Sequence, residues 1–373
     1  MIYITGIIIT FFLSLILLTK NQKSSADRIL SGWLCVILVH LTLFYLFSSQ
    51  AYVRFPYLLG LEIPLPLLHG PFLYLYTKAL TSGKMSFREM SFHFIPYILV
   101  FLTTIPFLLL GPEDKIKVYQ NEGEGYEILS AINLWGMIAS GAVYTVLSLR
   151  TLMRHKRQIR NNFSYTEKIN LEWLFRLILG LSLIWILVFL ADDEIIFTSV
   201  VLFVVFIGYY GIKQVGVFTN QPPPEPLPVH ESSEVIGSPV APPENTKYEN
   251  STLTDDQARD IHLRLVGLMK EEKLYLTPEL TLAMVSERLG VHPNTLSQVI
   301  NTWKQKNFFD YINSLRIEEF KERVHQPDNQ KYTLLSLAFE CGFNSKTSFN
   351  RNFKNLTGKS PSTYVKEYKS KPE

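Results

Sequence analysis

The sequence is short of cysteine and of charge. It has two cysteines, Cys35 and Cys341, among 373 residues, which is too few for a disulfide framework or a cysteine-based zinc site. Charged residues make up 18%, against roughly 25% in soluble globular domains. Because residues 251–373 hold 33 of the 69 charged residues, the shortage falls in the first two thirds of the chain. A single soluble enzyme domain, a disordered chain and a coiled coil are therefore excluded, and at least two dissimilar modules are expected.

The sequence also lacks the short motifs of common enzyme classes. It contains no glycine-rich phosphate loop, no HExxH zinc motif, no GxSxG nucleophile elbow and no kinase-type segment. We therefore predict that the chain is not an enzyme, and that it has no catalytic residue, no bound metal and no cofactor.

Seven apolar stretches follow one another in the first two thirds of the chain. A helix needs about 20 apolar residues to cross roughly 30 Å of hydrocarbon. The stretches cover residues 1–19, 29–53, 55–77, 90–112, 128–149, 177–191 and 195–212. The first lacks the basic start and the cleavage site of a signal peptide, so it is interpreted as a retained helix. Residues 1–218 are predicted to form a seven-helix transmembrane bundle that acts as a sensor.

Basic residues are distributed unequally between the connections of this bundle. Alternate connections hold 14 Lys and Arg residues on one side and three on the other. Loops rich in Lys and Arg stay in the cytoplasm. We therefore predict a multi-pass protein of a bacterial inner membrane, with the N-terminus outside, the loop 150–168 inside, and everything after Lys213 in the cytoplasm.

Two ionisable residues of the third stretch are candidate sensor residues. Glu62 and His69 lie seven positions apart, about two helical turns, and would share one helix face. Because ionisable side chains are costly in hydrocarbon, the pair is a candidate ligand or proton site. The alternative is that Glu62 is solvated near the outer interface and His69 forms a hydrogen bond between helices.

Residues 219–250 contain 8 prolines in 32 positions and few apolar side chains. A segment of this composition cannot form a core. We predict a disordered, proline-rich linker, which as a flexible coil would span about 30 Å.

The last third of the chain repeats one helical design twice. In the first copy Ser286 precedes Gly290 by four residues, and in the second Ala338 precedes Gly342 by four. A small residue lets a second helix pack closely, and the glycine takes the positive φ of a tight turn after the first helix. Each copy predicts a helix-turn-helix, and residues 308–324 predict a helix between the two.

Three segments of this region resemble the AraC/XylS family of transcription regulators. They are GFNSKTSFNRNFK at 342–354, TGKSPSTY at 357–364 and NFFDYINSLR at 307–316. The resemblance implies a DNA-binding domain over 251–373, whose two recognition helices enter successive major grooves about 34 Å apart. Two positions depart from the family pattern: His292 replaces the usual capping Ser, and Ser286 replaces the usual Ala.

The outward polar positions of the two recognition helices are the candidate base readers. Amide side chains suit adenine and Arg suits guanine. The candidates are Asn294, Thr295, Ser297, Gln298, Lys346, Thr347, Asn350 and Arg351, and the candidate phosphate contacts are Lys354, Lys359 and Ser360. For each of them the alternative is a solvated helix face. From Lys331 onward there are 8 basic and 3 acidic residues, a balance that favours nucleic acid.

Together these patterns predict an all-α protein, a seven-helix transmembrane bundle followed by a cytoplasmic AraC-type domain with two helix-turn-helix motifs. The favoured function is a membrane-anchored transcription regulator that binds double-stranded DNA and responds to a small-molecule or envelope signal. The lipid bilayer, RNA polymerase and a second copy of the chain are its further candidate partners. The alternative is a transporter or receptor whose cytoplasmic module binds protein.

Overall fold

The computed structural model describes residues 2–82, 85–167, 169, 171–213, 253–329 and 331–369. Over these ranges the chain is helical, and its only β feature is an isolated antiparallel bridge between Phe163 and Thr281. The all-α prediction is therefore confirmed for the described residues, whereas the predicted linker 219–250 lies outside them. The described residues divide into two compact units: residues up to 153 and from 171 to 213, and residues 154–169 with those from 253 on.

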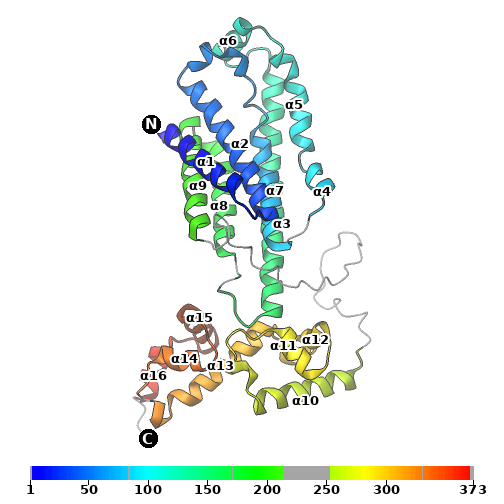
Figure 1. Cartoon of the computed structure of the whole chain (residues 1–373), viewed down its shortest axis with the longest axis vertical. Coiled ribbons are helices and arrows are strands. Elements are labelled where there is room, and N and C mark those ends of the chain that lie inside the picture. The colour runs from blue at the N-terminus through cyan, green and yellow to red at the C-terminus, as the bar shows by residue number, and fades with distance from the viewer. Residues whose placement is uncertain are drawn as a thin grey trace. The chain divides into compact units, whose positions relative to one another are not determined.

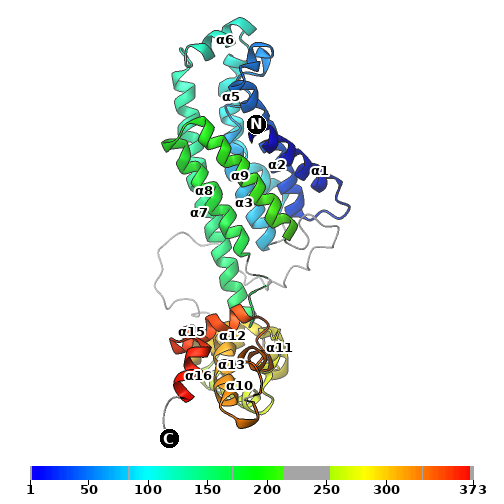
Figure 2. The same ribbon diagram turned by 90° about the vertical axis from the view of Figure 1, so that its left-hand side faces the viewer.

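The first unit is a bundle of helices (Figure 1). Its elements are α1 (Ile2–Thr19), α2 (Ser25–Ser48), α3 (Pro66–Ser82), α4 (Phe87–Phe92), α5 (Ile95–Leu108), α6 (Pro112–Gln120), most of α7 (Glu127–Asn162), α8 (Glu172–Leu190) and α9 (Asp193–Lys213). Helix α1 packs against α2 and α9, α8 packs against α9, and α2 packs against α3, as both views show (Figures 1 and 2).

Within the described residues, five helices are long and apolar enough to cross a membrane: α1, α2, α7, α8 and α9. The pair α5 and α6, bent by 110°, raises the number to six if it counts as one span. The predicted third span is not one helix, because short 3-10 turns at 51–53 and 56–58 precede α3, which begins at Pro66. Proline lacks the amide hydrogen that a helix interior needs, and Gly60 has a φ of +94°. The helices thus do not confirm seven spans.

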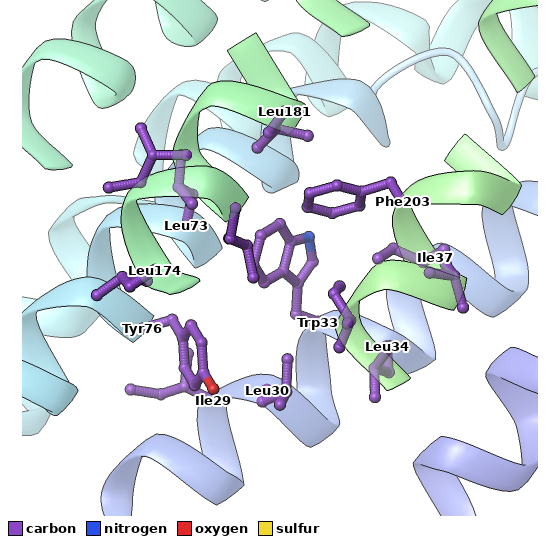
Figure 3. Packing of buried hydrophobic residues seen from close by; sticks show 14 of the residues in the cluster. Ile29, Leu30, Trp33, Leu34, Ile37, Leu73, Tyr76, Leu174, Leu181 and Phe203 are labelled. Atoms are coloured by element: carbon purple, nitrogen blue, oxygen red, sulfur yellow. The ribbon is translucent and has the colours of Figure 1, made fainter. Parts of the chain in front are cut away.

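The core of the first unit is built around Trp33 on α2, which is fully buried (Figure 3). Its ring lies 5.9 Å from that of Phe203 on α9. Tyr76 on α3 and Leu174 on α8 are buried in the same cluster. Large aromatic side chains contribute most of the apolar area in such a core, so this cluster holds α2, α3, α8 and α9 together.

The second unit contains seven described helices. They are α10 (Asp255–Glu271), α11 (Leu282–Leu289), α12 (Pro293–Lys304), α13 (Phe308–Val324), α14 (Leu334–Glu340), α15 (Lys346–Thr357) and α16 (Pro361–Lys369). They surround two separate hydrophobic cores, one within residues 261–312 and one within residues 317–353. Helix α13 belongs to both, because Phe308 and Ile312 are buried in the first core and Phe320 and Val324 in the second. The unit therefore has two halves that share one helix.

Candidate nucleic-acid interface

The first helical pair consists of α11 and α12. Thr281 begins α11 by accepting a hydrogen bond from the Met284 amide at 3.2 Å, and Gly290 ends it with a φ of +64°. His292 caps α12, since its Nδ1 accepts a hydrogen bond from the Asn294 amide at 3.2 Å. The imidazole thus fulfils the role that a Ser side chain usually fills at an N-cap.

The second pair, α14 and α15, has the same construction. Thr333 accepts a hydrogen bond from the Ser336 amide at 3.1 Å to begin α14, and Ser345 accepts one from the Ser348 amide at 3.0 Å to begin α15. Between the helices, Gly342 has a φ of +91°. A Cβ at Gly342 would lie 2.7 Å from the carbonyl oxygen of Tyr275, so this turn requires glycine for both its conformation and its space.

Each second helix buries one face and leaves the other outside. Helix α12 buries Leu296, Val299 and Ile300, and α15 buries Phe349 and Phe353. The exposed part of α15 carries the basic side chains Lys346, Arg351 and Lys354. A helix of this kind, fixed by its apolar side, can present its polar side to the major groove.

The structure places the candidate base readers on these outer faces to different degrees. Asn294, Lys346, Thr347, Asn350 and Arg351 are exposed, whereas Thr295, Ser297 and Gln298 are half-buried. The exposed donors therefore concentrate on α15.

The three candidate phosphate contacts have different surroundings. Lys354 is exposed on α15. Lys359 forms an ion pair with Glu367, and Ser360 accepts a hydrogen bond from the Thr363 amide at 3.2 Å at the start of α16. All three residues are exposed, but phosphate binding by Lys359 would compete with its carboxylate partner.

A polar cluster around Glu319 on α13 connects the two halves of the unit. The Glu319 carboxylate accepts hydrogen bonds from Lys273 at 2.9 Å, from the Tyr275 hydroxyl at 2.8 Å and from Arg323 at 2.7 Å. Burial alone would raise the pKa of Glu319, but these donors outweigh it and lower the pKa to about 2. This cluster was not predicted from the sequence. The i, i+4 spacing of Glu319 and Arg323 signals one pair, but nothing local signals the other two donors.

Arg316, one turn earlier on α13, is fully buried. Its Nε donates to the Tyr275 carbonyl and its Nη2 to the Thr277 carbonyl, both at 2.7 Å. Burial lowers the pKa of Arg316 to about 10, which leaves it protonated at neutral pH. Arg316 thus fixes α13 to the loop that precedes α11, a role that was also not predicted from the sequence.

The two candidate sensor residues of the first unit have different partners. Glu62 precedes α3, so it does not share a helix face with His69, and it accepts hydrogen bonds from the Tyr119 hydroxyl and from the Gly60 amide. His69 Nδ1 accepts from the Trp33 indole at 3.1 Å, and its Nε2 lies 3.2 Å from His40 Nδ1. A neutral imidazole that accepts at Nδ1 carries its proton on Nε2, so His69 donates to His40. Glu62 and His69 therefore belong to two separate polar clusters rather than to one joint site.

Comparison with known proteins adds one match. Residues 285–367 match the family model described as a helix-turn-helix domain, which is of the AraC type. The matched range starts within α11 and ends within α16, so it includes both helical pairs. No curated protein and no solved structure matches the chain. Because this domain is a DNA-binding regulatory domain rather than a catalytic one, the match supports a DNA-binding transcription regulator of the AraC type.

Proposed function

We propose that the chain is a membrane-anchored transcription regulator that binds double-stranded DNA sequence-specifically through two helix-turn-helix motifs. In this proposal α12 and α15 enter successive major grooves, and α13 between them sets their spacing. The observation that carries the proposal is the family match over 285–367, on two helical pairs that are capped and turned alike.

The exposed side chains suggest that α12 and α15 contribute differently to sequence selectivity. Helix α15 presents Lys346, Asn350 and Arg351 in the open, which suits bidentate hydrogen bonds to guanine and adenine edges. Helix α12 presents smaller polar groups, of which only Asn294 is exposed among the candidates. We therefore assign most of the sequence selectivity to α15, and phosphate binding to Lys354.

The membrane anchor is proposed from the apolar helices of the first unit. Five to six of the described helices suit a bilayer by length and composition, and the sequence predicts seven. The excess of Lys and Arg, 14 against three, supports a cytoplasmic second unit and an extracytoplasmic N-terminus in a bacterial inner membrane. A signal received by the bundle, at the Glu62 or His69 sites, would then control DNA binding.

DNA binding by purified protein tests this function. The full-length chain in lipid nanodiscs, and a fragment from residue 251 onward, are each incubated with random duplexes, and bound DNA is enriched and sequenced. We expect both to enrich one common motif with two half-sites about one helical turn apart, and its affinity to fall steeply with salt. An Asn355→Ala variant serves as the matched control, because Asn355 is exposed on α15 and is not a candidate reader.

Failure to enrich any DNA motif would contradict the proposed function. If the folded fragment and the full-length chain both enrich no motif, the DNA-binding function is wrong, and the second unit is instead a protein-binding module of a receptor or transporter. Helical content measured by circular dichroism ensures that a negative result comes from a folded protein.

A further inference from the structure

A short segment at the end of α7 is docked on the second unit. This docking segment, residues Arg160–Thr166, belongs to the same compact unit as the helices α10–α16. Phe163 forms an antiparallel bridge with Thr281, and the Ser164 amide donates to the Leu280 carbonyl at 3.1 Å. The segment is thus joined by its main chain to the start of α11, more than 100 residues further along the sequence.

The centre of the contact is a buried site that receives Ser164. The Ser164 carbonyl accepts hydrogen bonds from Asn313 Nδ2 at 3.0 Å and from Arg316 Nη1 at 3.3 Å, and its hydroxyl accepts one from Arg316 Nη2 at 3.0 Å. Asn313 is 3% exposed, and Arg316 is fully buried. A buried donor that loses its hydrogen-bond partner lowers the stability of the protein. Asn313 and Arg316 therefore form a binding site that favours the docked segment.

The two ends of the docking segment reach the opposite halves of the unit. Arg160 Nη2 lies 2.8 Å from each carboxylate oxygen of Asp310, and its guanidinium lies 5.5 Å from the centre of the Phe309 ring. At the other end, Thr166 Oγ1 accepts a hydrogen bond from Arg351 Nη2 at 3.2 Å. Arg351 is the exposed candidate guanine reader of α15. One segment therefore connects the first half, α13 and the recognition helix of the second half.

We propose that the docking segment is an intramolecular ligand of the DNA-binding unit and that it competes with DNA. A guanidinium binds guanine with two N–H groups in a fixed fork, and Thr166 occupies part of that fork in the docked state. The docked segment also ties the two halves of the DNA-binding unit together, because Ser164 bonds Leu280 in the first half and Thr166 bonds Arg351 in the second. Docked, the segment lowers the affinity for DNA; released, it frees Arg351. This inference rests on the proposed DNA-binding function.

Helix α7 gives the segment its link to the membrane. It is continuous from Glu127 to Asn162 and is one of the helices suited to crossing a bilayer. Its residues up to 153 belong to the first unit and those from 154 to the second. A signal that shifts or turns α7 therefore acts on Arg160 and Ser164 directly along this helix.

Variants of the docking segment test the proposal without touching a DNA-reading helix. Arg160→Glu reverses the charge that faces Asp310, and Thr166→Val removes the acceptor for Arg351. The matched controls are Arg157→Glu, an exposed position of the same helix with the same change of charge, and Thr166→Ser, which keeps the hydroxyl. Ser164→Pro is a further releasing variant, because it removes the amide that bonds Leu280.

The assay measures binding of the full-length chain in nanodiscs to a duplex enriched by that same chain. Loss of the hydrogen bond between Arg351 and Thr166, together with loss of the partly exposed ion pair between Arg160 and Asp310, predicts roughly tenfold tighter binding for the Arg160→Glu/Thr166→Val variant. Thr166→Ser should bind like the unchanged chain, and Arg157→Glu should bind like it or more weakly. Added negative charge alone would weaken DNA binding, so tighter binding cannot come from the change of charge.

Hydrogen exchange of residues 160–166 reports release of the segment in the same samples. If exchange accelerates while DNA affinity stays unchanged, the competition is refuted. If no releasing variant accelerates exchange, these contacts do not hold the segment, and the proposal is overturned as well. Failure of the unchanged chain and of every releasing variant to enrich any duplex would instead refute the proposed function itself, and the competition with it.

Discussion

Replacement of Gly342 by Ala should destabilise the second unit more than replacement of any other turn glycine in it. Gly342 has a φ of +91°, a conformation that residues with a Cβ rarely adopt. A Cβ there would lie 2.7 Å from the Tyr275 carbonyl oxygen, 2.8 Å from that of Leu276 and 2.9 Å from Arg316 Nε. Two of these atoms belong to the backbone, and the third is held by its hydrogen bond to Tyr275.

The loss of unfolding free energy expected for Gly342→Ala has two contributions. The left-handed backbone costs an L-residue about 1–2 kcal/mol, and the inserted methyl group adds roughly 1–3 kcal/mol because the surrounding atoms must shift. Gly342→Ala should therefore lower the free energy of unfolding by roughly 2–5 kcal/mol. Gly290→Ala is the matched control, since Gly290 has a φ of +64° but no atom within 4 Å of an added Cβ. Gly290→Ala should lower the free energy of unfolding only by the backbone contribution, about 1–2 kcal/mol.

Urea unfolding of the fragment from residue 251 onward, followed by circular dichroism, measures both values. Trp303 is the single tryptophan of this fragment and lies on α12, so its fluorescence reports the first half separately. The unfolding free energy obtained from circular dichroism should fall more for Gly342→Ala than for Gly290→Ala. Equal losses for the two variants would refute the packing that we describe between the turn at Gly342, the 275–276 loop and Arg316.

Three further outcomes are expected. Ser286→Ala should stabilise the second unit by about 1 kcal/mol in the same urea assay, because the buried Ser286 hydroxyl has no hydrogen-bond partner among the described residues; a loss of stability would contradict this. Arg351→Ala should relax selectivity at one base pair in competition binding, whereas Lys354→Ala should weaken all sequences alike and flatten the salt dependence. If both behaved alike, our assignment of base and phosphate contacts would be wrong. Finally, the Glu319 pKa of about 2 lies below its usual 4.5, so its stabilising contribution is complete above pH 4.5 and is lost as the pH falls toward 2. Roughly 2–3 kcal/mol of unfolding free energy should disappear over this range, and Glu319→Gln should flatten the pH profile; an unchanged profile would contradict the cluster.

Local features of the second unit could be predicted from the sequence. Turns depend on residues within four positions, so Gly290 and Gly342 indicated where the first helix of each pair ends, as the structure has it. The cap at His292 was less obvious, because a ring nitrogen is an uncommon N-cap acceptor.

Features that depend on distant residues could not be predicted in this way. The hydrogen bonds between Ser164 and Arg316 join positions 152 residues apart, and no hydropathy pattern records such a pairing. In the first unit, apolar composition alone did not show that Pro56, Pro64 and Pro66 prevent one continuous helix over 55–77. We expected Glu62 and His69 to share one face of that helix. Since Glu62 lies before the helix begins, this expectation was wrong.

The shared helix α13 also limits how the spacing of the two proposed recognition helices can change during evolution. It has 17 residues, about 25 Å at the usual rise. One inserted residue would turn the second half by about 100° relative to the first, and only insertions of three or four residues nearly restore the original face, about 5 Å further away. In the proposed regulator, the distance between the two recognition helices could therefore change only in steps of one α-helical turn, and each step corresponds to roughly one to two base pairs of the operator.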